Sequence, residues 1–213
     1  MLNIRKVMTG LALIALVLPM PVSAGVYEDM LQAIRIDNQS GVAALLKKGV
    51  DVDSVSPEGE PLIMLAAKEG HPGVVKTLLA AKPKLMARNP YGETALMIAA
   101  IRGHTEIVRL LLAEGAPVDH PGWTPLIYAS VHGRLDIIQL LIAKGAKIDA
   151  QATNGVTALM MAAREGQMQA ALLLLQNGAN VNHETESGYT PLKFAQSRNQ
   201  DEMARMLVRA GAK

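Results

Sequence analysis

The sequence repeats itself with a period of 33 residues, and this period is the strongest constraint on its fold. Four segments share the pattern Gly-x-Thr-x-Leu, and their threonines stand at positions 94, 124, 157 and 190, so the spacings are 30, 33 and 33 residues. A degenerate copy starts at Gly59 and places Pro61 at the threonine position. A fixed period of this length indicates a solenoid, because each unit buries its apolar side only against its neighbours.

Each unit is expected to form two helices joined by a turn. The threonine is a suitable N-cap, because its hydroxyl can accept a hydrogen bond from a free backbone N–H of the first helical turn. Pro125 and Pro191 follow at the first helical position, where a missing N–H costs nothing. A pair of small residues such as Ala99-Ala100 allows close approach of a neighbouring helix, and Gly103 then ends the helix.

A second apolar stretch with helical spacing follows each turn, for example over residues 107–112 and 137–142. It closes on a Gly-Ala pair, and the glycine suits the left-handed conformation found just after a helix. An extended segment then leads to the next threonine. The closing pairs are Gly115-Ala116, Gly145-Ala146, Gly178-Ala179 and Gly211-Ala212.

This unit resembles the ankyrin repeat, whose period and Thr-Pro-Leu-His signature it largely shares. The resemblance covers residues 26–213 and implies an all-α fold, an α-solenoid of about six stacked repeats, each a helix–turn–helix with an extended finger. The expected repeats span residues 26–58, 59–91, 92–121, 122–154, 155–187 and 188–213. The first and the last are expected to cap the array, since a terminal unit lacks one neighbour.

The chain departs from the family pattern at several positions. Lys82-Pro83 stands where Gly-Ala is expected, which makes that helix end less favourable. The finger between Gly115 and Thr124 is three residues short. At the position of the family's histidine we expect apolar packing in place of a hydrogen bond. The residues there are Met64, Met97, Ile127, Met160 and Lys193.

The N-terminus has the features of a secretory signal. Arg5 and Lys6 precede an apolar run over residues 7–18, and Val22 and Ala24 then occupy the −3 and −1 positions of a suitable cleavage site ahead of Gly25. We therefore expect a cleaved signal peptide over residues 1–24, a mature domain over residues 25–213 and a periplasmic location. An uncleaved anchor is the alternative, but about 20 apolar residues are needed to span a bilayer.

Charge and composition argue against several other functions. Removal of Arg5 and Lys6 lowers the 21 basic residues to 19, which equals the 19 acidic ones, so no nucleic-acid partner is expected. The five histidines show no metal-binding spacing, and the chain has no cysteine. We expect no enzymatic activity, no metal and no cofactor. Met64, Met97 and Met160 recur at one helix position, which favours a core role over Cu(I) binding or oxidant scavenging.

The resemblance implies that a partner protein binds the concave face, which the finger tips and the exposed positions of the first helices form. Three of the chain's few aromatic residues fall on these fingers, and Tyr, Trp and Arg often anchor interfaces. The alternative is that these rings pack between neighbouring fingers. The predicted partner-binding residues are Lys68, Tyr91, Ile101, Arg102, Trp123, His132, Arg164, Glu165 and Tyr189.

The function that the resemblance implies is that of a non-catalytic protein–protein interaction scaffold. A monomer is expected, with no membrane association once the signal peptide is removed. The chain is similar to small exported ankyrin proteins of bacteria, which implies that it supports or regulates an exported partner, such as an enzyme of peroxide defence. The alternative is an immunity protein that neutralises a toxin delivered to the periplasm.

Overall fold

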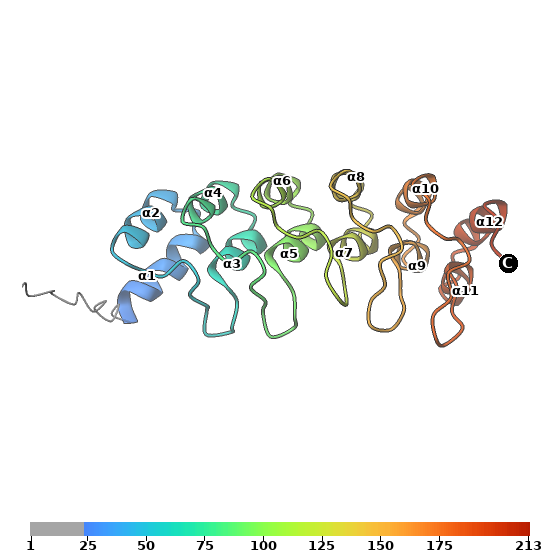
Figure 1. Ribbon diagram of the computed structural model, residues 1–213, viewed down its shortest axis with the longest axis horizontal. Coiled ribbons are helices and arrows are strands. Elements are labelled where there is room, and N and C mark those ends of the chain that lie inside the picture. Colours follow the sequence, from blue (N-terminus) through green and yellow to red (C-terminus); the bar gives the residue numbers. More distant parts are fainter. Residues whose placement is uncertain (1–23) are drawn as a thin grey trace, which may run out of the picture.

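A computed structural model describes residues 24–213 of the chain, which form a row of helix pairs stacked along one axis (Figure 1). Residues 1–23, and with them the predicted signal peptide, lie outside the described residues. The twelve helices of the described chain are α1 (Ala24–Arg35), α2 (Gln39–Lys47), α3 (Leu62–Glu69), α4 (Pro72–Ala80), α5 (Ala95–Arg102), α6 (Thr105–Ala113), α7 (Pro125–Val131), α8 (Leu135–Ala143), α9 (Ala158–Arg164), α10 (Met168–Gln176), α11 (Pro191–Ser197) and α12 (Asp201–Arg209).

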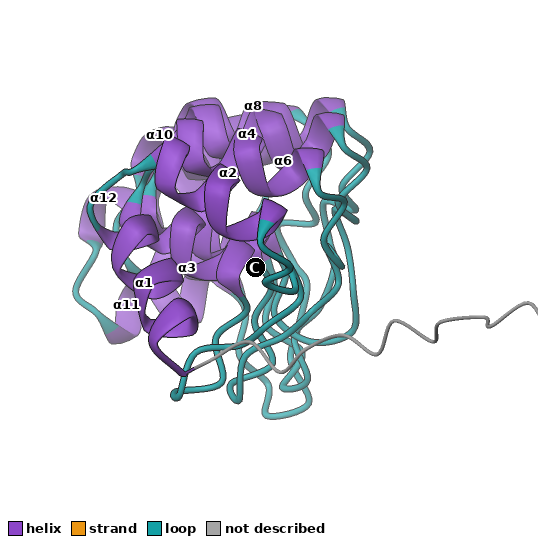
Figure 2. Ribbon diagram, turned by 90° about the vertical axis from the view of Figure 1, so that its left-hand side faces the viewer, coloured by secondary structure: helices purple, strands orange, loops and turns teal. Residues whose placement is uncertain are grey.

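The odd-numbered helices form an inner layer and the even-numbered helices an outer layer, while the loops between repeats project to one side as fingers (Figures 1 and 2). Over residues 24–213 the only β-type pairing is an isolated bridge between Val55 and Pro61. The predicted all-α solenoid of six helix pairs is therefore confirmed. None of the helices described is long and apolar enough to cross a membrane.

The predicted N-caps of the inner helices are confirmed. The hydroxyl oxygens of Thr94, Thr124 and Thr157 accept from the backbone N–H three residues later, at 3.4, 3.2 and 3.4 Å. Thr190 does the same in the last repeat, at 3.3 Å. The inner helices therefore start at the same point of each repeat, which keeps neighbouring helices in register.

The methionines at the family's histidine position differ from the expectation of purely apolar packing. The Sδ of Met97 accepts a hydrogen bond from the Thr94 N–H at 3.4 Å, and the Sδ of Met160 accepts from the Thr157 N–H at 3.5 Å. The thioether is a weak acceptor, but both sulfurs are buried beside an N–H that would otherwise lack a partner. Met therefore fills the core and completes the helix cap at once.

The core lies between successive inner helices and between the inner and outer layers. The paired alanines of α3, α5 and α9 are fully buried, and these helices contact the inner helix of the next repeat (α3 with α5, α5 with α7, α7 with α9 and α9 with α11). Between them lie larger side chains such as Leu62, Leu96 and Leu159. Burial of one such leucine stabilises the fold by about 1.5–3 kcal/mol. The alanines allow the close approach and the leucines supply most of the buried apolar area.

The extended segments are joined from repeat to repeat by a ladder of side-chain hydrogen bonds. The Asp53 carboxylate accepts from the backbone N–H of Lys84 at 2.8 Å, and Asp119 and Asp149 do the same for Lys147 and Asn180 at 3.0 and 3.1 Å. The ladder skips one step, where Met86 takes the acidic position and Pro117, which has no N–H, takes the donor position. At this step both the carboxylate acceptor and the N–H donor are absent, so neither is left without a partner.

Candidate functional site

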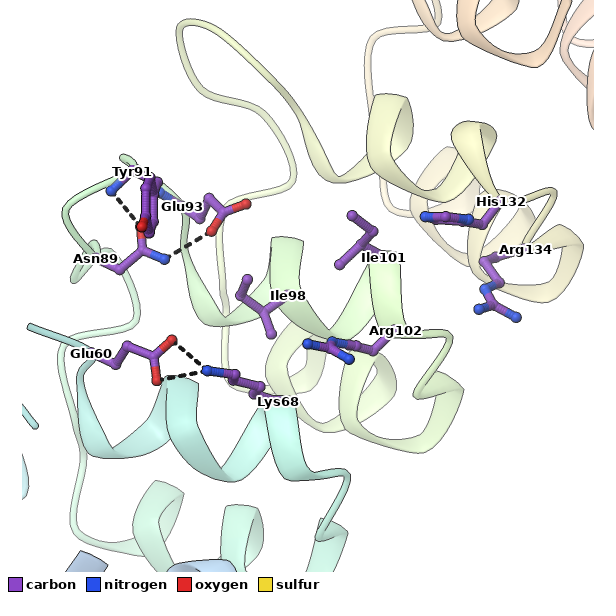
Figure 3. Close-up of a pocket in the computed structure, with 10 residues that line it drawn as sticks. All are labelled: Glu60, Lys68, Asn89, Tyr91, Glu93, Ile98, Ile101, Arg102, His132 and Arg134. Atoms are coloured by element: carbon purple, nitrogen blue, oxygen red, sulfur yellow. Dashed lines mark hydrogen bonds and ion pairs between the residues drawn. The ribbon is translucent and has the colours of Figure 1, made fainter. Parts of the chain in front are cut away.

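A pocket of about 550 Å³ lies between the fingers and the inner helices of the second to fourth repeats (Figure 3). We call it the central pocket. Helices α3 and α5 and the turn between α7 and α8 form one side, and the fingers before α3 and α5 form the other. Its lining residues are Glu60, Lys68, Asn89, Tyr91, Glu93, Ile98, Ile101, Arg102, His132 and Arg134.

The buried side chain of Asn89 sets the shape of the second finger. Its Oδ1 accepts from the backbone N–H of Tyr91 and of Glu93, both at 3.0 Å, and its Nδ2 donates to the Glu93 carboxylate at 2.8 Å. An asparagine that bonds the backbone two residues on is typical of a turn. The turn holds the Tyr91 backbone at the finger tip, where the ring is 86% exposed.

The two carboxylates of the central pocket are already bound within the protein. Lys68 Nζ lies 2.9 and 3.1 Å from the two oxygens of Glu60. Glu93 accepts from Asn89 on one oxygen and from the Tyr128 hydroxyl, at 2.9 Å, on the other. Burial raises the pKa of Tyr128 above its ordinary value, and the hydrogen bond to Glu93 and its negative charge raise that pKa further. Tyr128 therefore stays a donor well above neutral pH.

Across the central pocket from the two carboxylates lie basic side chains that form no ion pair within the described chain. The Arg102 and Arg134 side chains form no ion pair within residues 24–213, and both residues are exposed. A Cβ added to Gly103 would lie 2.8 Å from the guanidinium carbon of Arg134, so this side chain rests directly on the turn after α5. Figure 3 shows Arg102, His132 and Arg134 together, across the pocket from Glu60 and Glu93.

A second, smaller pocket of about 250 Å³ lies at the short third finger, and we call it the finger pocket. The Trp123 ring packs against Tyr128, with 5.2 Å between the ring centroids. His120 bonds the carbonyl of Pro121 at 2.7 Å and contacts the Met97 sulfur at 3.2 Å. Tyr91 lines both pockets, so it forms the ridge between them.

The model of the family described as ankyrin repeats (3 copies) matches residues 63–152 and 149–213. The chain belongs to the ankyrin-repeat family. Domains of this family generally mediate protein–protein interaction, and the fold is a typical non-catalytic interaction scaffold. The search of curated proteins found no match.

Two solved structures resemble this ankyrin-repeat chain over most of its length. The human ASB11 ankyrin repeat domain superposes with a TM-score of 0.79 at 25% identity, and the match covers 86% of this chain and 84% of that one. The ankyrin repeat domain of Bcl-3, described as a unique member of the IκB protein family, superposes with a TM-score of 0.76 at 30% identity, over 87% of this chain and 86% of that one.

The ankyrin array brings five of the nine predicted partner-binding residues into one place. Trp123 lines the finger pocket instead, against Tyr128. Arg164 and Glu165 lie one repeat further along and pair with each other at 3.5 Å. Tyr189 packs against Phe194 in the last repeat, with 5.2 Å between the ring centroids, and is 45% exposed. The five residues in the central pocket are Lys68, Tyr91, Ile101, Arg102 and His132.

Sequence reasoning did not include other residues of this groove. Asn89 had a signal, because Asn-Pro-Tyr-Gly is a turn sequence and asparagine commonly organises such turns. Tyr128 and Arg134 had no such signal in the sequence, because their roles depend on which neighbouring repeat they face. The missed residues include Asn89, Ile98, His120, Tyr128 and Arg134.

The described ankyrin repeats contain no group of three or more His, Cys, Asp or Glu side chains placed to hold a metal ion. The methionines Met64, Met97 and Met160 are buried to within 1% of complete burial, which confirms their predicted place in the core. Met97 also lines the finger pocket, where its sulfur contacts His120 Nε2 at 3.2 Å.

Proposed function

We propose that this ankyrin-repeat protein binds a partner protein through the groove that the central pocket and the finger pocket form. The observation that supports this proposal most directly is the position of Tyr91. Tyr91 is 86% exposed, yet its turn is held by the Asn89 side chain, which accepts hydrogen bonds from the backbone N–H of Tyr91 and of Glu93. An exposed aromatic ring on a fixed turn loses little conformational entropy on binding, which is a property of interface anchors.

We further propose that the protein acts in the periplasm, where it supports or regulates an exported partner. The support for this step is the sequence pattern of the first 24 residues, with a basic start, a short apolar run and a small residue at the cleavage point. An enzyme of peroxide defence is one such partner. Fractionation of cells that produce the full chain tests the location, and a cytoplasmic, uncleaved product would contradict it.

The binding proposal is tested by cross-linking in intact cells, followed by capture of the protein and identification of what is bound to it. Tyr91→Ala is expected to reduce recovery of the partner at least about fivefold, in line with the loss of more than 1 kcal/mol that is typical of interface anchors. Tyr189→Ala is the matched control, because it removes the same ring from a finger three repeats away. Circular dichroism spectra should show that both variants stay folded.

Unchanged recovery with Tyr91→Ala and with Trp123→Ala would show that the groove is not the binding surface. Once the partner is purified, its activity distinguishes the proposed role from the alternative. A supporting protein preserves or raises the activity of an enzyme partner, whereas an immunity protein abolishes that of a toxin.

A further inference from the structure

We infer that the central pocket takes an acidic side chain of the partner, with an apolar side chain next to it along the partner's chain. This inference rests on the proposed function, because it specifies the chemistry that the same groove recognises. The argument comes from the hydrogen-bonding capacity that the pocket leaves unused.

The acidic groups of the central pocket have little capacity left for a ligand. Both oxygens of Glu60 face Lys68, and each oxygen of Glu93 already accepts a hydrogen bond. A basic side chain of a partner would have to compete with Lys68 for Glu60. The carboxylates therefore serve to fix the fingers, not to recruit a cation.

The basic groups of the same pocket are in the opposite situation. Arg102 and Arg134 each carry five N–H donors, and neither forms an ion pair inside the described chain. A carboxylate can accept two parallel hydrogen bonds from one guanidinium, which is stronger than a contact between neutral groups. A carboxylate from outside is the ligand that matches this unused capacity.

An apolar surface lies directly beside the two arginines. Ile98 and Ile101 line the pocket on the same helix as Arg102, and the Tyr91 ring stands opposite on the finger. Figure 3 shows Ile98 between Arg102 and the finger residues, and Ile101 nearer to His132. A segment that places its acid on Arg102 therefore brings a neighbouring side chain over the isoleucines, where burial of apolar area favours an apolar residue.

The neighbouring pocket at the N-terminal end of the groove does not share this preference. It is lined by Arg35 and Lys68 together with the three acidic residues Glu58, Glu60 and Glu69. Acidic groups outnumber basic ones there, so a partner carboxylate is repelled. The preference for an acidic side chain is confined to the end of the groove that holds Arg102 and Arg134.

The test uses a phage-displayed library of random twelve-residue peptides, selected against the purified protein. The expected result is enrichment of peptides with Asp or Glu beside Leu, Ile, Val, Met or Phe. Synthetic versions are then measured by fluorescence anisotropy, with Glu→Gln or Asp→Asn in the peptide and Arg102→Gln in the protein. Each single change is expected to weaken binding about five- to tenfold, and the two together little more than one alone, because they remove the same contact.

Arg109→Gln is the matched control, because Arg109 is an exposed arginine on the outer helix α6 and the change in charge is the same. It should leave peptide affinity unchanged. The peptide affinity should also fall as salt is raised, since exposed ionic contacts are screened. Failure to enrich peptides, enrichment of peptides without acidic residues, or equal affinity for Arg102→Gln would each overturn the inference.

The partner-capture experiment separates this inference from the proposed function. If Tyr91→Ala abolishes capture and Arg102→Gln leaves it intact, the groove binds the partner but not through an acidic side chain. If neither variant affects capture, the groove is not the interface and both proposals fail.

Discussion

At the scale of the residue, Lys82 is a site of backbone strain. Its φ of 55° is left-handed, and the same position in every other repeat is glycine, for example Gly115 with φ 82°. A non-glycine residue in this conformation lowers the free energy of unfolding by about 1–2 kcal/mol. Glycine avoids this strain, but its greater conformational freedom in the unfolded chain cancels part of the gain. We expect Lys82→Gly to raise the free energy of unfolding by about 0.5–1 kcal/mol, measured by urea denaturation.

Lys144 offers a matched control for this prediction. It also follows an outer helix, but its φ is −92°, which any residue adopts. Lys144→Gly is expected to leave stability unchanged or to lower it slightly. Equal effects of the two substitutions would show that the strain at Lys82 is negligible.

The Tyr128–Glu93 hydrogen bond is a second residue-scale feature with a measurable consequence. Tyr128→Phe removes the donor from a half-buried carboxylate, so we expect a loss of about 1 kcal/mol at neutral pH. The pKa of Tyr128 is raised on folding, so its contribution is fully present below the unfolded value of about 10 and is lost as the pH rises beyond it. The stability gap between wild type and variant should therefore narrow above pH of about 10.

Urea denaturation between neutral pH and pH of about 11 checks this expectation. Tyr91→Phe is the control, because the Tyr91 side chain is 86% exposed and its hydroxyl makes no hydrogen bond within the described chain. A gap between Tyr128→Phe and wild type that stays constant across this pH range would contradict the assigned role of Glu93.

At the scale of the element, the caps of the inner helices depend on methionine as well as threonine. Met97→Leu conserves volume but leaves the buried Thr94 N–H without its sulfur acceptor. Met64→Leu makes the same change in α3, where Pro61 holds the N-cap and has no N–H to lose. We expect Met97→Leu to cost about 1 kcal/mol more than Met64→Leu in thermal or urea unfolding. Equal costs would mean that the sulfur acts only by filling space.

The elements themselves could be predicted from the sequence because their signals are local. Thr94 at the N-cap, Pro125 at the first helical position and the glycine after most of the helices act on their own backbone, and the structure confirms all three. The sulfur bond of Met97 could not be predicted in the same way, since the family pattern suggests only a missing histidine. Its geometry depends on how the side chain folds back over the cap.

The groove was less predictable than the helices, because its contacts join residues from different repeats. The period placed Tyr91, Arg102 and His132 on one face, and they do line one pocket. It could not show that Tyr128 reaches back 35 residues to Glu93, because the direction of a side chain across a turn is not written in the spacing. Nor could it show that Tyr189, on the same face in the last repeat, packs against Phe194.

At the scale of the whole molecule, contacts run from each repeat to the next. Inner helices pack on inner helices from α1 to α11, and outer helices pack on outer ones from α2 to α10. The stability of such an array is close to a sum of repeat and nearest-neighbour terms. The outer face of the last repeat is richer in polar side chains than the faces buried between repeats, although Val208 is 55% exposed there. Its exposed polar residues include Lys193, Gln196, Ser197, Arg198, Arg205 and Arg209.

This asymmetry predicts that the loss of the last repeat is worse than the loss of an internal one. A chain that ends at residue 187 exposes the face of α9 that packs on α11, which is apolar. A chain that lacks residues 155–187 joins Asn154 to Gly188 in register, and keeps the polar terminal repeat. Both variants should unfold at lower urea concentration than the full array, because each loses one interface between repeats.

The two deletions should differ in solubility. We expect the chain that ends at residue 187 to associate in sedimentation experiments, because a contiguous apolar face is then open to solvent. The internal deletion should stay monomeric. If both variants remained monomeric and equally soluble, the polar surface of α11 and α12 would have no capping role, and the end of the array would be set by the number of repeats alone.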